Sequence, residues 1–441
     1  MRNIHLIVSI LVTLFFHQFA VAEVKSSVDV MGLSFISSDY NSVDKTNFGF
    51  VGASLISNPK QPETFMINFQ GFYAPGNAVL SYLNFKEIYF TVPLDNYSQI
   101  HIGRKLKKWS ALDSDWNLGF FQPQFRWNSL APENQGLTGV FWDHDESNWG
   151  LSLFASPIFL PDQGPGYEVK DGQFQNSNPW FNTPPQNIRF QGQLFPIDYN
   201  INTPQTSDVV LQSVYAAQLR FGEKMVGPFA NFSAAYKPSN QFALGYSGVL
   251  VTTRVKIDVT PKSYSENNYA ADFGFREGWG LAQFSLLYTK PQQPKFENVA
   301  NVPVFTDSLS WGPRFIYNFR PFQVGFAYLD TQGGEVTEVG PDASGDRQSL
   351  SQRFLYRQAF QVHAQYSEIF MKKLKWESLL QYTQSTKDPF KLIRFHNKLD
   401  IKGPWAFTSD LILIDTADDS SVNMNAYRNL DQFWIGVSYD I

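Results

Sequence analysis

The sequence predicts an all-β protein that forms a single antiparallel transmembrane β-barrel of about 18 strands, within a range of roughly 16 to 20. Three observations predict this fold. Apolar and polar residues alternate in segments of about ten residues along nearly the whole chain. The chain starts with a segment typical of an export signal, and its last segment alternates up to Ile441. Between these two ends, no apolar run approaches the roughly 18 residues of a transmembrane helix.

The composition suits a membrane barrel better than a soluble domain. Of the 441 residues, 16% are aromatic and only 17% are charged, whereas an ordinary globular domain has about 25% charged residues. The net charge of −5 does not favour nucleic-acid binding, which usually requires a basic patch. Because the chain has no cysteine, it has no disulfide, no thiolate metal site, no iron–sulfur cluster and no thiol nucleophile. We expect no cofactor and no metal.

The first residues have the pattern of a bacterial signal peptide. Arg2 supplies a positive charge, residues 4–16 are largely apolar, and an A-x-A cleavage pattern ends at Ala22. We therefore expect cleavage after Ala22, a mature barrel of residues 23–441, and a location in the outer membrane of a Gram-negative cell. The alternative is that residues 1–22 remain as an uncleaved membrane anchor.

Alternation assigns one face of each segment to lipid and the other to the lumen. Within residues 391–402, Ile393 and Phe395 share the apolar face, whereas Arg394 and His396 share the polar one. A strand half-buried in a soluble sandwich would also alternate. Here the polar faces carry full charges and the apolar faces are large and aromatic, as in a barrel that satisfies every backbone group in lipid. The expected strands are residues 24–36, 45–56, 63–73, 80–92, 98–105, 136–143, 148–156, 209–221, 227–236, 240–257, 267–276, 278–289, 307–319, 322–330, 354–367, 372–384, 391–401, 404–415 and 428–441.

This count is odd, whereas bacterial single-chain barrels normally have an even number of strands. Tight turns at Lys402-Gly403, at Arg320-Pro321 and at residues 237–240 are expected on the periplasmic side. When the strands are counted from the N-terminus and from the C-terminus, the two counts give opposite directions for the strand that begins near residue 209. We therefore expect the error inside residues 157–208, where residues 188–194 are a further candidate strand.

Three long connections, residues 106–135, 157–208 and 331–353, separate the expected strands. In a barrel, such loops cap the outer mouth or fold partly into the lumen. The first two loops and the strand end before them contain candidates for a pore constriction, which are Arg104, Lys105, Lys107, Lys108, Trp109, Trp116, Arg126, Trp127 and Trp180.

Two interpretations of these candidates are open. The rings would stack on sugars or other apolar surfaces while the cations coordinate anionic groups. Alternatively, the rings only pack the loops onto the barrel rim, because Trp and Tyr are enriched at barrel interfaces whatever the cargo. The basic side chains of residues 104–108 would then bind lipid phosphates at the outer mouth.

Further cations point into the lumen by strand alternation, and rings of such charges bias a pore toward anions. Acidic side chains at Glu377, Asp400 and Asp410 share the same face, so mutual pairing within the wall is the alternative role. The lumen cations are Arg220, Arg314, Arg357, Arg394, His396 and Lys398.

No enzyme is expected. Residues 23–441 contain four histidines and neither a G-x-S-x-G nor an H-E-x-x-H pattern. His363 and His396 suit polar wall positions. Residues 143–146 (Asp-His-Asp-Glu) are expected to form a charged turn between two strands rather than a metal site.

The last segment of the chain has the alternation of a barrel strand. Phe433, Ile435, Val437, Tyr439 and Ile441 alternate strictly, which resembles the terminal strand by which outer-membrane barrels are recognised for insertion, although those usually end in Phe or Trp. With the export signal and the whole-chain alternation, the chain resembles the bacterial porin superfamily.

A second, looser resemblance lies within residues 103–142, where Gly103-Arg104, Trp109, Gly119 and the stretch 136–142 are similar to large substrate-specific porins. The resemblance implies a channel for passive diffusion of small hydrophilic solutes, and the lumen cations named above predict a weak anion bias. It also implies contact with outer-membrane lipid, and it leaves a homo-oligomer open. The alternative is a closed or plugged barrel that acts in surface binding, in adhesion or as a subunit of an envelope machine.

Overall fold

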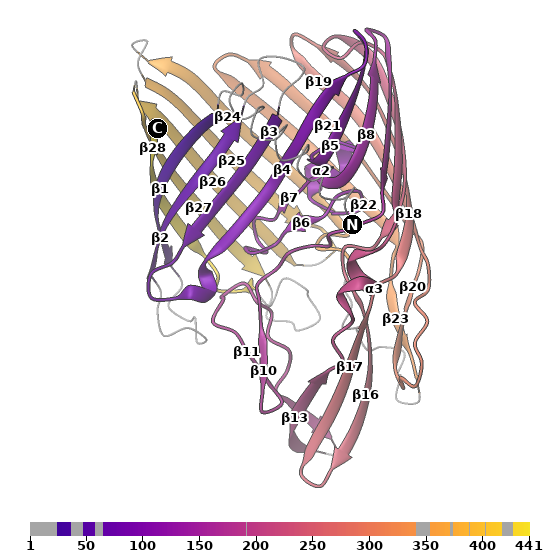
Figure 1. Cartoon of the computed structure of the whole chain (residues 1–441). Helices are drawn as coiled ribbons and strands as arrows, with labels where there is room; N and C mark the ends of the chain where they lie inside the picture. Colours follow the sequence, from indigo (N-terminus) through magenta and orange to yellow (C-terminus); the bar gives the residue numbers. More distant parts are fainter. Residues whose placement is uncertain are drawn as a thin grey trace, which may run out of the picture.

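The computed structural model describes residues 24–36, 47–57, 65–190, 192–340, 353–370, 374–387, 389–401, 403–416 and 427–441. The predicted signal peptide, residues 1–22, lies outside the described residues. Eighteen strands pair in one sheet, and the first strand, β1, also pairs with the last, β28, with Val28 opposite Tyr439. All these pairings are antiparallel, so the sheet is a closed barrel (Figure 1). This confirms the predicted fold class and the strand number.

Each barrel strand pairs with its neighbours in chain order. The barrel strands are β1 (Val24–Phe35), β2 (Asn47–Ser57), β3 (Phe65–Tyr73), β4 (Tyr82–Pro93), β5 (Ser98–Lys105), β8 (Leu137–Asp145), β9 (Trp149–Ser156), β14 (Val214–Phe221), β15 (Gly227–Pro238), β18 (Ser265–Glu277), β19 (Gly280–Pro291), β21 (Ser308–Phe319), β22 (Phe322–Gly333), β24 (Gln358–Phe370), β25 (Leu374–Ser385), β26 (Phe390–Ile401), β27 (Trp405–Thr416) and β28 (Gln432–Asp440).

The other elements lie in the connections. They are η1 (Ala78–Leu80), α2 (Ala111–Trp116), β6 (Gln124–Phe125), β7 (Glu133–Asn134), β10 (Glu168–Lys170), β11 (Gln173–Gln175), β12 (Asn187–Phe190), β13 (Gln193–Ile201), α3 (Thr206–Val210), β16 (Ala243–Val251), β17 (Arg254–Lys262), β20 (Val302–Phe305) and β23 (Val336–Val339). No helix in the described part of the chain is both long enough and apolar enough to cross a membrane.

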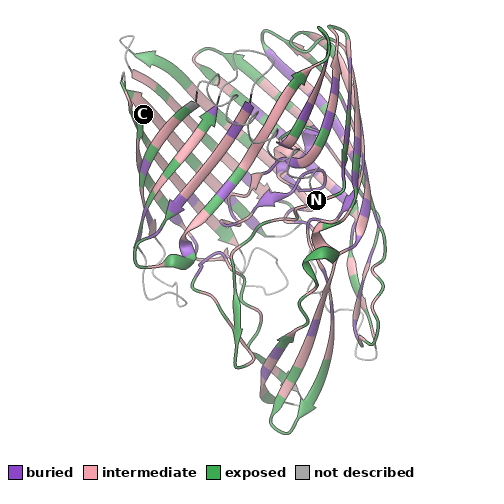
Figure 2. Cartoon of the chain, viewed as in Figure 1, coloured by how far each residue is buried: buried purple, intermediate pink, exposed green. Residues whose placement is uncertain are grey.

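The alternation of the sequence becomes the two faces of the barrel wall. Exposed and less exposed residues alternate along the strands (Figure 2). The predicted outward side chains Phe433, Ile435 and Tyr439 of β28 are exposed. A band of large apolar side chains on the outer face is what a lipid-facing barrel requires.

The two ends of the barrel differ in the length of their connections. Tight turns at residues 278–279 and 320–321 lie at one end, whereas long connections follow β5, β9, β15 and β22 at the other end, the lower one in Figure 1. In bacterial barrels the short turns face the periplasm and the long loops face the exterior. The predicted periplasmic turns at Arg320-Pro321 and Gly403 lie at the short-turn end; Lys402 lies outside the described residues.

Two details of the predicted strand order are wrong. Residues 240–257 are not a barrel strand, because they contain β16 and the start of β17, which form a hairpin beyond the barrel. The predicted turn at residues 237–240 therefore lies at the long-loop end. Residues 188–190 and 193–194 are likewise outside the barrel wall, since they belong to β12 and β13. The surplus strand of the predicted count was residues 240–257, so the expectation that the error lay inside residues 157–208 is wrong.

A second, small sheet projects from the long-loop end. It has the order β12-β13-β17-β16, and β13 pairs in parallel with β17, with Ile197 opposite Val255. Ile197, Tyr199 and Val259 form its own small core. In Figure 1 this sheet extends well below the rim of the barrel.

Candidate functional site

A long loop lies inside the barrel between β5 and β8. It comprises residues 106–136, which we call the inward loop, and it contains α2, β6 and β7 (Figure 1). The Ser110 side chain accepts a hydrogen bond from the Asp113 amide and so caps the start of α2. Asn117 ends α2 in a left-handed conformation with φ 49°, which Asn adopts more readily than most residues. The local sequence therefore places a short helix within the lumen.

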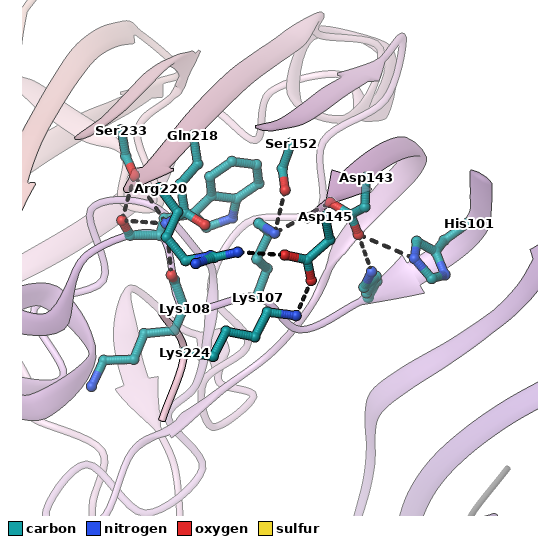
Figure 3. A network of polar contacts seen from close by, with 12 residues as sticks. His101, Lys107, Lys108, Asp143, Asp145, Ser152, Gln218, Arg220, Lys224 and Ser233 are labelled. Carbon is teal, nitrogen blue, oxygen red and sulfur yellow. Dashed lines mark hydrogen bonds and ion pairs between the residues drawn. The ribbon is translucent and has the colours of Figure 1, made fainter. Parts of the chain in front are cut away.

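Side chains of three wall strands hold the first half of the inward loop. Gln218 of β14 and Ser233 of β15 donate to the Trp109 carbonyl at 3.0 and 2.5 Å (Figure 3). Asp272 of β18 accepts a hydrogen bond from the Ala111 amide at 3.1 Å. A buried polar group left without its partner costs about 1–3 kcal/mol. These contacts therefore dock the loop firmly against the wall.

Asp113 is the internal support of the same region. Its buried carboxylate accepts hydrogen bonds from the amides of Phe120 at 2.8 Å and Phe121 at 3.0 Å. Burial raises the pKa of the Asp113 carboxyl to about 6, although the two amide hydrogen bonds oppose this rise. The charge of this carboxylate therefore changes near pH 6.

We expect the inward loop to be docked more stably at acid pH. The pKa of Asp113 is raised from 3.8 to about 6 in the docked loop. The protonated carboxyl therefore stabilises docking fully below pH 3.8, and this stabilisation is lost as the pH rises through 6. This difference corresponds to on the order of 3 kcal/mol. Hydrogen exchange of residues 111–121, corrected for intrinsic rates, should show greater protection at pH 5 than at pH 8.

The variant Asp113→Asn, which resembles the protonated form, should remove most of this pH dependence. Asp208→Asn in the exposed helix α3 is the matched control and should keep it. An unchanged pH dependence in Asp113→Asn would show that another group controls docking.

The second half of the inward loop is held by a buried polar network. Arg104 of β5 donates to the Gln135 side-chain oxygen at 2.8 Å, and Gln135 in turn donates to Asn84 at 2.8 Å and to Gln163 at 3.0 Å. All four side chains come from different parts of the chain. Arg104 is therefore a support of the loop rather than an exposed cation at the outer mouth.

Arg126 has a similar role. Its guanidinium lies 2.8 Å from a carboxylate oxygen of Asp162, and Asp162 also accepts a hydrogen bond from the Gln124 amide at 2.7 Å. Burial raises the pKa of the Asp162 carboxyl, and the Arg126 charge opposes this rise. The pair joins the inward loop to the start of the connection between β9 and β14.

Two of the candidate tryptophans belong to one aromatic cluster near β1, β2 and β28. The ring of Trp127 lies 4.7 Å from that of Trp180, and Trp180 stacks on Trp434 at 6.1 Å. Trp180 is only 1% exposed. Phe50 of β2 contacts Trp127 edge-on at 6.0 Å. These rings are packed against each other, which favours the packing interpretation of their role.

The other two candidate tryptophans are also buried. Trp109 stacks on Phe121 and on Phe141 of β8, and it is 1% exposed. Trp116 of α2 contacts Tyr356 edge-on at 5.9 Å. Together with wall residues from most barrel strands, all four tryptophans are part of one continuous apolar cluster.

Asp143 of β8 is the centre of a cationic group on the lumen wall (Figure 3). His101 and Lys105 of β5 lie 3.1 and 2.5 Å from its carboxylate, and Lys107 lies at 3.3 Å. Lys107 also donates to Ser152 of β9 at 2.6 Å. Here three basic side chains share a single carboxylate.

Asp145 at the end of β8 repeats this arrangement. Arg220 of β14 lies 2.7 Å from its carboxylate, and Lys224 contacts the second oxygen (Figure 3). The predicted charged turn at residues 143–146 is therefore only partly correct. Asp143 and Asp145 are strand residues paired with cations, and the turn itself begins at Glu146.

Two further candidates meet at Asp115 in the inward loop. Lys108 lies 3.0 Å and Arg314 of β21 lies 2.6 Å from its carboxylate. Arg357 lies directly before β24, which begins at Gln358, and not within a strand as predicted. Arg357 instead pairs with Glu335 at 3.1 Å in the connection between β22 and β24.

On the wall of β25, β26 and β27, two of the predicted lumen cations are paired. His396 lies 2.6 Å from Asp410, and Lys398 lies 3.1 Å from Asp400. The pairing that the sequence left open as an alternative therefore describes both side chains.

Arg394 differs from its neighbours. Among the described residues it has no hydrogen bond and no ion pair. It lines two cavities between the inward loop and the wall: one of about 220 Å³ with Glu133, Trp434 and Asp410, and one of about 40 Å³ that includes Asp115. The acids that line these cavities are engaged elsewhere, since Glu133 lies 2.6 Å from Lys86 and the other two are paired as described.

The sequence analysis did not identify the residues whose hydrogen bonds hold the inward loop, among them Asp272, Gln218 and Gln135. Each is a polar residue at an inward position of a strand or loop, and nothing local distinguishes it from other lumen residues. Asp272 and Gln218 are each more than a hundred residues away in the sequence from the loop residue that they contact. Only the three-dimensional pairing shows their role. No group of three or more possible metal ligands occurs among the described residues.

Comparison with known proteins gives a likeness of fold. The sequence matches no protein-family model and no curated protein. Among solved structures, OccK9 (OpdG) of Pseudomonas aeruginosa has a TM-score of 0.49 at 9% identity, over 95% of this chain and 98% of that one. OccAB1 of Acinetobacter baumannii has 0.47 at 12% identity, over 95% and 96%. The outer membrane protein OpdK of P. aeruginosa has 0.47 at 11% identity, over 95% and 99%. This chain therefore resembles these β-barrels in fold, at low sequence identity.

Proposed function

We propose that this protein is a channel for passive diffusion of small hydrophilic solutes across the outer membrane. The solute route runs between the inward loop and the wall formed by β24 to β28. The observation that carries this proposal is Arg394, an unpaired cation with a cavity on either side. A charged side chain without a protein partner in a lumen needs water or a solute around it.

The same residue supports a weak preference for anions. Along this route Glu133 pairs with Lys86 and Asp115 pairs with Arg314, whereas Arg394 has no partner among the described residues. A cation at a narrow point attracts anions and repels cations. Polar and aromatic groups share the lining of the larger cavity, which suits solutes that carry both a charge and an apolar part.

The first test is single-channel conductance of the refolded protein in a planar bilayer with a salt gradient. We expect discrete current steps and a reversal potential of the sign given by anion preference. Folding is checked separately by the heat-dependent gel mobility typical of barrels. Folded protein that passes no current would contradict the proposal.

A closed barrel that binds a partner at the cell surface is the second candidate function. Two observations favour it: the apolar cluster of the inward loop joins most barrel strands, and the small sheet β12-β13-β17-β16 projects beyond the rim. Absence of current together with binding of a surface polymer or protein to the projecting sheet would support it. A homo-oligomer stays a prediction for either function.

A further inference from the structure

An apolar groove crosses the outer, lipid-facing side of the barrel at β14, β15, β18 and β19. Its volume is about 520 Å³, within the roughly 300–1,000 Å³ that pockets for whole small ligands occupy. Ala217, Ala234 and Ala271 lie at its floor, and Tyr269 and Tyr288 are among the larger side chains beside them. The groove is separate from the lumen, because strand alternation places these side chains on the outer face.

The groove exists because small side chains adjoin on neighbouring strands. Ala217 lies opposite Ala234, and Ala271 lies opposite Phe232. Tyr269 and Tyr288 face each other across β18 and β19, with rings stacked at 6.3 Å. A row of alanine methyl groups beside large rings leaves a groove on the outer surface of the wall that the protein's own side chains do not fill.

A basic residue stands at the outer end of this groove. Lys290 is on the same outward face of β19 as Tyr288, two positions closer to the long-loop end. It is exposed and has no ion pair with any described residue. At the same rim, the carboxylate of Asp307 accepts a hydrogen bond from the Tyr288 hydroxyl at 2.5 Å. Lys290 is thus available to an anion at the outer membrane surface.

An acyl chain of a lipid fits these observations better than a second copy of the protein. The groove is concave and lies in the band that contacts hydrocarbon, so membrane lipid is present at high concentration around it. A lipid with a phosphate brings an apolar chain and an anion in one molecule, and each methylene buried in the groove adds to its affinity. A lysine near the membrane surface attracts an anionic headgroup.

We propose that this groove binds one acyl chain of a phosphate-bearing lipid of the outer leaflet, with Lys290 at the phosphate. The bound lipid would cover the wall opposite Gln218, Ser233 and Asp272, which dock the inward loop from the other side of the same strands. The proposal is independent of whether the lumen conducts.

The test is native mass spectrometry of the detergent-solubilised full chain with lipid A, an acylated and phosphorylated disaccharide, and with its dephosphorylated form. We expect one tightly bound lipid A per barrel. Ala234→Phe, which fills the groove, should weaken binding at least about tenfold. Lys290→Gln should weaken binding of the phosphorylated form about fivefold and leave the dephosphorylated form unchanged.

Matched controls lie elsewhere on the same outer face. Ala364→Phe on β24 and Lys391→Gln on β26 should bind as the unmodified protein does. Equal binding by Ala234→Phe and the unmodified protein would overturn the proposal. So would a protein dimer that Ala234→Phe dissociates, since a second copy would then fill the groove. If Ala234→Phe does not fold, Lys290→Gln with the two lipid forms decides the question alone.

Discussion

Replacing residues 111–133 of the inward loop with a short Gly-Ser linker is expected to raise the single-channel conductance several-fold. Barrels of about 16–18 strands leave an aqueous channel when nothing fills them. Here α2, β6 and β7 lie in the lumen, and the aromatic rings of the loop join an apolar cluster that reaches most wall strands. Removing this segment deletes the main obstruction while the hydrogen-bonded wall remains closed.

The control removes a segment of similar size outside the lumen. Shortening the projecting hairpin of β16 and β17 should leave the conductance nearly unchanged, because it lies beyond the rim. Both variants must keep the gel mobility of a folded barrel. If both deletions raise the conductance equally, or neither does, the inward loop is not the constriction. A large rise from a silent parent protein would instead favour the plugged barrel.

The wall of this barrel was predictable because alternation is a local property. Residues 391–402 show it, since Phe395 and Ile401 are exposed to lipid while Arg394 and His396 line the lumen. The same signal failed for residues 240–257. Alternation reports that a strand has two different faces, and β16 and β17 also have two faces in the projecting sheet. The pattern does not state which sheet a strand joins.

The candidate site was predictable only in part, for a related reason. Long loops with several Trp residues indicated an infolded segment, and the structure has one. However, ring burial depends on contacts such as Trp180 with Trp434, which are distant in the sequence. The distinction between paired and unpaired cations also depends on long-range pairing. Arg314 and Arg394 are indistinguishable in the sequence, yet one is bound by Asp115 and the other is not.

Arg394→Glu is expected to move the reversal potential toward cation preference, and Arg394→Gln to move it about half as far. The reason is that Arg394 is the unpaired cation that lines both cavities, so Arg394→Glu reverses the charge at this point of the proposed route and Arg394→Gln removes it. A charge in a narrow, partly desolvated passage acts more strongly than one in open water. The measurement is the zero-current potential under a tenfold KCl gradient, repeated at high and low salt.

Two further variants separate this effect from a general change of charge. Lys391→Gln removes a cation from the opposite, outward face of the same strand and should leave selectivity unchanged. Lys398→Gln removes a paired lumen cation and leaves Asp400 unpaired, so a moderate shift is expected. If Lys398→Gln shifts the potential more than Arg394→Glu does, the selective part of the lumen lies nearer the short-turn end. The route past Arg394 would then be wrong even though the barrel conducts, because a charge controls selectivity only where the passage is narrowest.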